Sequence, residues 1–513
     1  MRWRWWWWWW ILGAVGLGLV VRLGVLASPM GELDADEAVV GLMARHIAFD
    51  GELPVFYYGQ AYLGSLEAFT AAPLFLAFGS SAQLLKLVPL AYSLGFLVLS
   101  ALVARRVFGD GPAILTAVYL ALPPAMWALW STKARGGYAE VLFLGEALLM
   151  ISLWLATQKR PPWGWLAWGL VAGLALWTHL LAVVYILPAV AFLALRRRRW
   201  VTSEVLAGCV GLLVGVAPLL VANFSDGYAT LAIVSGPAGI TVEPLGELLR
   251  FLRTGISMLA GVGRPVPPLT LASDLAWDVP TAGPLVVVAP LVVVLVGVLV
   301  WHLPSVRRLI SGQPCSDAAL LVLVALMVPV TLIFTSYGYF MAEPRYALPL
   351  YSAVPLVANA VWQLPLRMRF ATGFVIVALS VWNIVATAAL VMRPSDLVDS
   401  TPDNRQALIG YLASQDRHQV YTDYWIAQTI MFESKDQIQA AVIADGPNRY
   451  LPAADNVAQT PNAVAVFVRD SGTDQRFAAR LAEVGARAKV TSVDAYHVYS
   501  DVSPLDAVLE AFS

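Results

Sequence analysis

Charged side chains are scarce in this sequence. Asp, Glu, Lys and Arg make up 13% of its 513 residues, whereas soluble proteins carry about 25%. Hydrophobic residues reach 59%, and the mean hydropathy is +0.69. These values exclude a water-soluble multidomain enzyme and predict a chain that lies largely in a membrane.

A basic surplus, cysteine and internal repeats are also missing. The formal net charge is −1, so the chain has no excess of cations to bind nucleic acid. Its two cysteines, Cys209 and Cys315, lie in an apolar segment and a basic loop, which excludes a disulfide framework and a Cys/His metal site. No internal repeat is evident, which argues against a transporter built from inverted repeats.

Long apolar runs are what the chain has instead. The first follows Trp5–Trp10 and extends to Ala27, which is long enough to cross the ~30 Å hydrocarbon layer and longer than a signal-peptide core. We expect it to be a retained first span with its tryptophans at headgroup level. Ten more spans are predicted, at 83–103, 112–130, 138–157, 163–179, 180–195, 203–224, 284–302, 318–337, 346–363 and 371–391.

The basic residues orient these eleven spans. With a cytoplasmic N-terminus, every predicted inner loop is basic, and together these loops hold fourteen Lys and Arg residues. The short outer connections hold only Lys133, Arg135 and Arg345. Positive charge is enriched in cytoplasmic loops, so the C-terminal tail is predicted to lie outside the cytoplasm.

The sequence therefore predicts a polytopic α-helical membrane protein with about eleven transmembrane helices and a small C-terminal α/β domain. Residues 1–392 form the membrane domain, which has large outer loops at 28–82 and 225–283. Residues 393–513 form the non-cytoplasmic domain, in which 419–421 and 463–468 resemble strands, 476–486 an amphipathic helix and 489–499 a strand or hairpin.

Four carboxylates open the first outer loop: Glu32, Asp34, Asp36 and Glu37. Acids this close raise one another's pKa, so the cluster is either relaxed by water as a solvated loop start or holds a base, a metal or a cationic partner. The stretch 38–49 after it has the pattern of an amphipathic helix lying in the membrane interface.

This arrangement resembles the GT-C superfamily of membrane glycosyltransferases, which includes protein O-mannosyltransferases and aminoarabinose transferases. Asp36–Ile47, followed by the segment from Tyr58 to Glu67, is similar to bacterial family-39-like glycosyltransferases. The sequence departs from better-known relatives at 64–67, where they have a Pro-Pro-Leu-type segment, and this difference leaves the acceptor open.

The resemblance implies roles for the acids. Asp36 is expected to be the base that takes the proton of the acceptor hydroxyl, with Glu37 orienting it or the acceptor. Asp34 and Asp36 also have the Asp-x-Asp spacing that holds a divalent cation in some relatives, whereas mannosyltransferase-like members work without metal. Mg²⁺ or Mn²⁺ therefore stays an open alternative.

A phosphate-linked sugar donor carries negative charge, so its site requires cationic side chains at the outer membrane surface. Arginine suits this site because its guanidinium group binds two phosphate oxygens at once. Arg345, beside Glu343 and Tyr346, is similar in place to the family's donor-phosphate site; Arg135, before Tyr138, and Lys133 are further candidates. The alternative is that these cations contact lipid headgroups. Tyr58, Gln60 and Glu67 are further candidates for substrate contacts and are equally suited to holding their own loop. His179 is a last candidate, although a lone histidine at such a turn is more often a hydrogen-bonded loop residue.

The resulting hypothesis is an inverting hexosyl- or pentosyltransferase of the bacterial plasma membrane. It would move sugar from a polyprenyl-phosphate carrier to a lipid, glycan or protein acceptor at the outer face. A transporter or flippase for lipid-linked sugars, or a non-catalytic relative, is the alternative. A transporter would place paired ionisable groups near the bilayer midplane, whereas these acids cluster at one surface.

Overall fold

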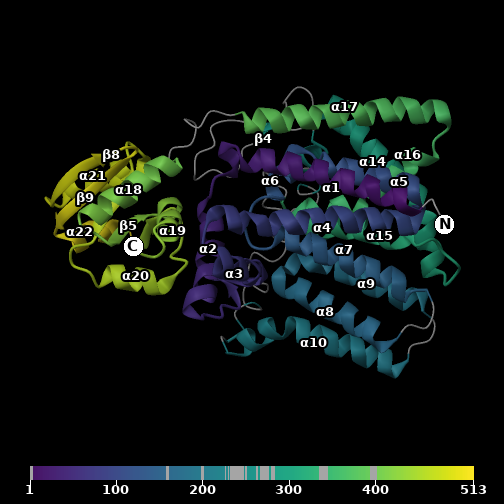
Figure 1. Cartoon of the computed structure of the whole chain (residues 1–513), viewed down its shortest axis with the longest axis horizontal. Coiled ribbons are helices and arrows are strands. Elements are labelled where there is room, and N and C mark those ends of the chain that lie inside the picture. Colours follow the sequence, from purple (N-terminus) through teal and green to yellow (C-terminus); the bar gives the residue numbers. More distant parts are fainter. Residues whose placement is uncertain are drawn as a thin grey trace.

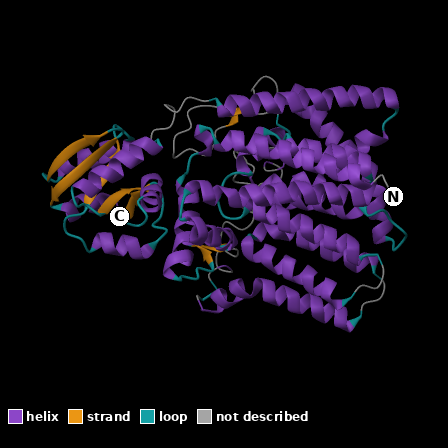
Figure 2. Cartoon of the chain, viewed as in Figure 1, coloured by secondary structure: helices purple, strands orange, loops and turns teal. Residues whose placement is uncertain are grey.

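The computed structural model describes residues 4–157, 161–197, 201–225, 251–261, 284–333, 345–392 and 401–512. It also describes 227–228, 230, 246, 248, 264–265 and 277–278. A bundle of helices forms most of the molecule, and a smaller unit with a β-sheet lies at one end of it (Figures 1 and 2).

The bundle is an integral membrane domain. Within the described residues, five helices are long and apolar enough to cross a membrane, by length and composition, and shorter apolar helices pack beside them. The helices are α1 (Arg4–Leu26), α4 (Ala82–Phe108), α5 (Asp110–Ala121), α6 (Ala125–Trp130), α7 (Tyr138–Leu155), α8 (Pro162–Thr178), α9 (Val183–Arg196), α10 (Thr202–Ser225), α13 (Ile256–Leu259), α14 (Pro284–Ile310), α15 (Ala318–Ile333), α16 (Val354–Gln363) and α17 (Leu366–Val391). Shorter pieces are the 3₁₀ turns η3 (Leu180–Ala182) and η6 (Arg345–Ala353), the π-helical turn η4 (Phe251–Gly255), and the strand pair β3 (Arg264–Pro265) and β4 (Trp277–Asp278).

Helices lie in each of the eleven expected spans, but two spans are interrupted. The run 112–130 divides into α5 and α6 at Pro123 and Pro124, because proline has no N–H to continue a helix. The run 346–363 begins as the 3₁₀ turn η6 before it becomes α16. The count of eleven membrane crossings stays a prediction.

The first outer loop is a folded unit. It contains the 3₁₀ turn η1 (Pro29–Gly31), α2 (Ala35–Arg45), the π-helical turn η2 (His46–Asp50), the hairpin β1 (Phe56–Tyr57) and β2 (Gln60–Gly64), and α3 (Leu66–Phe78). The sequence had not predicted α3. The loop also differs from the expected interfacial helix, because Val40, Met43 and His46 are all buried.

The C-terminal unit is built on a five-stranded sheet of order β6-β5-β7-β9-β8. The strands β5, β6 and β7 run parallel, while β9 runs antiparallel to both β7 and β8. Its strands are β5 (Gln419–Asp423), β6 (Gln439–Ala444), β7 (Val464–Val468), β8 (Arg487–Val493) and β9 (Tyr496–Ser503). Its helices are α18 (Pro402–Ser414), α19 (Tyr424–Glu433), α20 (Leu451–Ala458), α21 (Gly472–Glu483), α22 (Leu505–Leu509) and the 3₁₀ turn η8 (Glu510–Phe512).

An apolar core joins this unit to the first outer loop. Val39, Leu42 and Met43 of α2 belong to the same buried cluster as Ile430 and Phe432 of α19. Helix α19 packs so closely on α2 that a Cβ at Gly41 would lie 2.6 Å from the Phe432 ring. Figure 1 shows α19 and α20 facing α2 and α3. The acidic cluster therefore lies where the two parts of the molecule meet.

Candidate active site

The acidic cluster surrounds the first turn of α2. Asp34 is the N-cap: its Oδ1 accepts a hydrogen bond from Glu37 N at 3.1 Å, and Glu37 Oε2 accepts one from Asp34 N at 3.3 Å. This reciprocal capping satisfies two backbone N–H groups that a helix start leaves free. It also sends the side chains of Asp36 and Glu37 in different directions.

Glu37 lies in a buried ion network. Its carboxylate bonds Lys86 Nζ at 2.5 Å, Lys133 Nζ at 3.1 Å and Ala134 N at 3.0 Å, and its side chain is fully buried. Lys86 is itself buried against this acid. Glu37 does not line the cavity described below, so its position supports a structural role.

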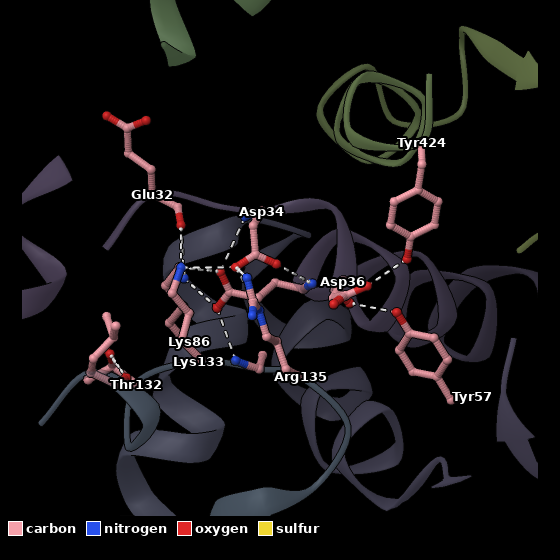
Figure 3. Close-up of polar contacts among 12 residues, drawn as sticks. Glu32, Asp34, Asp36, Tyr57, Lys86, Thr132, Lys133, Arg135 and Tyr424 are labelled. Atoms are coloured by element: carbon pink, nitrogen blue, oxygen red, sulfur yellow. Dashed lines mark hydrogen bonds and ion pairs between the residues drawn. The ribbon is translucent and has the colours of Figure 1, made fainter. Parts of the chain in front are cut away.

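Asp34 is held by two cations. Its Oδ2 lies 3.0 Å from Lys133 Nζ and 2.8 Å from an Arg135 nitrogen (Figure 3). Burial alone would raise the pKa of Asp34, but the charges of Arg135 and Lys133 outweigh burial and hold it well below its ordinary value. Asp34 is thus ionised, and its charge is already paired with two cations.

Asp36 is the acid that reaches open space. Its backbone carbonyl accepts a hydrogen bond from Tyr57 OH at 3.1 Å, and its Oδ1 accepts one from Tyr424 OH at 2.6 Å (Figure 3). Within the described part of the chain, no hydrogen bond is made to Asp36 Oδ2. One carboxylate oxygen is therefore fixed, and the other is left for a ligand.

The space beside Asp36 is a cavity of about 180 Å³. It is smaller than the ~300–1,000 Å³ of typical ligand sites. Its lining combines one carboxylate with three arginines, four tyrosines and one histidine. The lining residues are Asp36, Tyr57, Gln60, Tyr62, Leu63, Arg135, Tyr138, His179, Arg345, Tyr346 and Arg449.

Aromatic rings hold the cations and imidazole of this cavity. The Arg345 guanidinium lies 5.4–5.8 Å from the ring centres of Tyr346, Trp130 and Tyr138, distances typical of cation–π contacts. The His179 ring lies 5.1 Å from that of Tyr138. His179 Nδ1 accepts a hydrogen bond from Leu181 N at 2.9 Å, so Nε2 is the nitrogen left for a ligand.

Two predicted substrate contacts lie outside the cavity, and a third cannot be located among the described residues. Tyr58 OH bonds Glu52 at 2.6 Å and His46 at 2.9 Å, outside the cavity. Glu67 is buried, and its Oε2 accepts hydrogen bonds from Gly136 N and Gly137 N, so it supports the loop that carries Arg135. Glu343 lies outside the described residues.

The sequence had missed four polar residues of the site, as well as Leu63. Tyr57 and Tyr62 belong to the hairpin, in the same segment as the predicted Tyr58 and Gln60, so alternation along the strands was the available signal. Tyr424 and Arg449 come from the C-terminal unit, hundreds of positions away from Asp36. No local motif marks those two.

Comparisons with known proteins identify similar sequences and folds. Residues 66–221, from α3 to α10, match the family described as dolichyl-phosphate-mannose-protein mannosyltransferase. ArnT from Cupriavidus metallidurans, solved bound to undecaprenyl phosphate, is 16% identical and superposes with a TM-score of 0.66 over 97% of this chain and 98% of its own. The chain has the GT-C fold.

An archaeal structure with the GT-C fold is also similar. The oligosaccharyltransferase of Archaeoglobus fulgidus, solved with Zn and sulfate, is 12% identical and has a TM-score of 0.52 over 95% of this chain and 73% of its own. No curated protein matches the sequence. At these identities the likeness concerns the fold, so the activity must be argued from the cavity.

Proposed function

We propose that this protein is an inverting glycosyltransferase of the bacterial plasma membrane that moves a sugar from a polyprenyl-phosphate donor to an acceptor hydroxyl at the outer face. One observation carries the proposal: Asp36 opens into the same cavity as Arg345 and Arg135. A base and phosphate-binding groups are the two things that such a transfer requires at one place. The ArnT structure bound to undecaprenyl phosphate supports a lipid-phosphate donor of this kind.

In the proposed reaction, Asp36 Oδ2 takes the proton of the acceptor hydroxyl. The acceptor oxygen then forms a bond to the anomeric carbon, while the bond from that carbon to the phosphate oxygen breaks. The bonding electrons leave with the polyprenyl phosphate, whose charge Arg345 stabilises. Attack from the face opposite the phosphate inverts the anomeric centre.

The small cavity volume supports transfer of a single sugar unit. Tyr62, Tyr138, His179 and Gln60 supply donors and acceptors for sugar hydroxyls around it. The eleven spans and the non-cytoplasmic α/β domain belong to the same proposal, because the basic loops then all face the cytoplasm. Sugar identity and acceptor class stay open between a hexose or pentose and a lipid, glycan or protein.

We propose that the reaction needs no metal at the Asp-x-Asp pair. Asp34 already bonds Lys133, Arg135 and a backbone N–H, so a divalent cation beside it would face two positive charges. Across the described residues, no group of three or more His, Cys, Asp and Glu side chains is placed to hold a metal.

The test compares wild type with Asp36→Asn on a panel of polyprenyl-phosphate sugars, with and without chelator. Released polyprenyl phosphate is measured by mass spectrometry. The variant keeps the side-chain shape but cannot take a proton, and positioned bases contribute about 10²–10⁴-fold to rate. We expect a loss of that size with donor binding retained, and no effect of the chelator.

Other outcomes contradict parts of this proposal. Near-normal turnover by Asp36→Asn removes the base from the mechanism. Movement of intact lipid-linked sugar across a vesicle membrane, without release of polyprenyl phosphate, supports the transporter alternative instead. Loss of activity on chelation, reversed by Mg²⁺ or Mn²⁺, overturns metal independence.

A further inference from the structure

The C-terminal unit contacts the proposed base directly. Tyr424 OH donates a hydrogen bond to Asp36 Oδ1 at 2.6 Å, and the Tyr424 hydroxyl oxygen accepts one from Arg449 Nε at 3.3 Å. Figure 3 shows the Tyr424 side chain extending from its helix toward Asp36. Arg449, Tyr424 and Asp36 therefore form a chain of hydrogen bonds that ends on the carboxylate.

The fold explains why Tyr424 is at this place. Asp423 ends β5, and its Oδ1 caps α19 by accepting from Trp425 N at 2.9 Å and Ile426 N at 3.0 Å, so Tyr424 is the first residue of that helix. Strand β5 has β6 on one side and β7 on the other. In open α/β sheets, ligands bind outside the carboxyl ends of the strands where the strand order reverses. Here that edge faces the first outer loop.

Arg449 is held by neutral groups. Its Nη1 donates to Gly59 O at 3.4 Å, and Gln60, with its amide oxygen turned toward the guanidinium, accepts from Nη2 at 2.8 Å. The guanidinium lies 5.5 Å from the Tyr57 ring centre and 5.6 Å from that of Tyr424. No carboxylate of the described residues makes an ion pair with it, and its hydrogen-bonded connection to Asp36 runs through the Tyr424 hydroxyl.

We infer that Tyr424, held by Arg449, is a positioning residue for Asp36, and that the C-terminal domain thereby completes the active site. This inference rests on the proposed function, in which Asp36 takes the acceptor proton. A carboxylate turns about its terminal torsion, which is broad in energy. The hydrogen bond to Oδ1 fixes that torsion and presents Oδ2 to the acceptor.

Docking of the domain does not require this hydroxyl. The α2–α19 contact is already made by the apolar core described above and by close packing of Phe432 on Gly41. Burial and the negative charge of Asp36 raise the pKa of Tyr424 above its ordinary value, so the phenol stays protonated as a donor. Tyr424→Phe therefore removes the hydroxyl that donates the hydrogen bond to Asp36, while the aromatic ring and the docking surface are kept.

The experiment uses the full-length protein and polyprenyl-phosphate sugar as donor. We expect Tyr424→Phe to lower kcat about tenfold, the lower end of what a hydrogen bond to a charged group contributes, with the donor KM unchanged. In an Asp36→Asn background the same substitution should change the residual rate little, because the group that it positions no longer takes a proton.

Tyr499→Phe is the matched control. Tyr499 OH donates to Asp474 Oδ1 at 2.7 Å in the same domain, but its ring packs on Phe467 and Phe477, away from the cavity. Its removal should leave kcat unchanged. Arg449→Gln is the second variant if Tyr424→Phe does not fold, and it should show a smaller fall in kcat with the same dependence on Asp36.

The outcomes separate the two proposals. Normal kcat in Tyr424→Phe, with Asp36→Asn inactive, overturns the positioning role and leaves the proposed function intact. Equal losses in Tyr424→Phe and Tyr499→Phe, or equal factors in both Asp36 backgrounds, show a structural effect and also overturn it. Near-normal activity of Asp36→Asn overturns both.

Discussion

Three carboxylates at the start of one helix have different surroundings and different roles. Asp34 caps α2 and pairs with Lys133 and Arg135, Glu37 is buried against Lys86 and Lys133, and Asp36 opens into the cavity. Residues of a helix start point in directions about 100° apart, so neighbours in sequence meet different surroundings. A cluster that looked electrostatically unfavourable is thus relaxed by specific cations.

Arg345 provides the residue-scale test of donor binding. Arg345→Ala should weaken binding of polyprenyl phosphate about 10- to 150-fold, because a hydrogen bond to a charged group contributes roughly 1.5–3 kcal/mol. Arg345→Lys should recover only part of the loss, since an ammonium lacks the planar fork. Calorimetric titration of the purified protein measures both.

The control for Arg345 is Arg367→Ala, which removes an exposed arginine from a predicted inner loop and should bind as wild type does. Unchanged affinity in a folded Arg345→Ala protein would remove Arg345 from the donor site.

Helix packing near the cavity depends on glycine. Gly169 and Gly173 of α8 face Gly211 and Gly215 of α10, and a Cβ at any of these four would overlap backbone atoms of the other helix. Small residues four apart allow this close approach in membranes. Helix α8 ends at Thr178, and the next residue, His179, lines the cavity.

Gly173→Leu should destabilise the protein by disturbing the packing of α8 against α10. A side chain there has no space against Leu212 O, and overpacking costs about 1–3 kcal/mol. The melting temperature in detergent should fall. Gly16→Leu in α1 is the matched control, because a Cβ there meets nothing within 4 Å. Equal melting temperatures for the two variants would contradict the packing argument.

At the scale of the whole molecule, the two parts depend on each other. The C-terminal unit covers α2 with apolar side chains and adds Arg45–Asp436 as an ion pair across the junction. It also supplies Arg449 to the cavity. The active site of the proposed enzyme therefore requires the first outer loop and the C-terminal unit on the same side of the membrane.

Cysteine labelling tests that arrangement. Ala478 is exposed on α21, so Ala478→Cys should react with a membrane-impermeant thiol reagent in intact spheroplasts. Cys315, in the predicted inner loop between α14 and α15, should react only after lysis. The reverse pattern, with Ala478→Cys labelled only in lysed cells, would show that the span count is wrong and that the cavity does not face outward.

The sequence by itself determined the membrane class and the positions of most long helices, and it singled out Asp36 as the candidate base. Apolar runs, basic loops and a local acidic motif are each formed by consecutive residues. The free energy of burying an apolar run in lipid hardly depends on the rest of the fold. The same reasoning identified Arg135 and Arg345, because outer cations are few. It left Tyr58 and Glu67 open between substrate contact and holding the loop, and it expected Glu37 to orient Asp36 or the acceptor; in the structure all three bond to other parts of the protein.

Only the tertiary structure decided which acid faces the cavity and what surrounds it. The partners of Glu37 and Asp36 lie 49 and 388 positions away, at Lys86 and Tyr424. Such pairings follow from the docking of an α/β unit onto the first outer loop. That docking depends on shape and on apolar contact between segments distant in sequence, and no spacing along the chain records it.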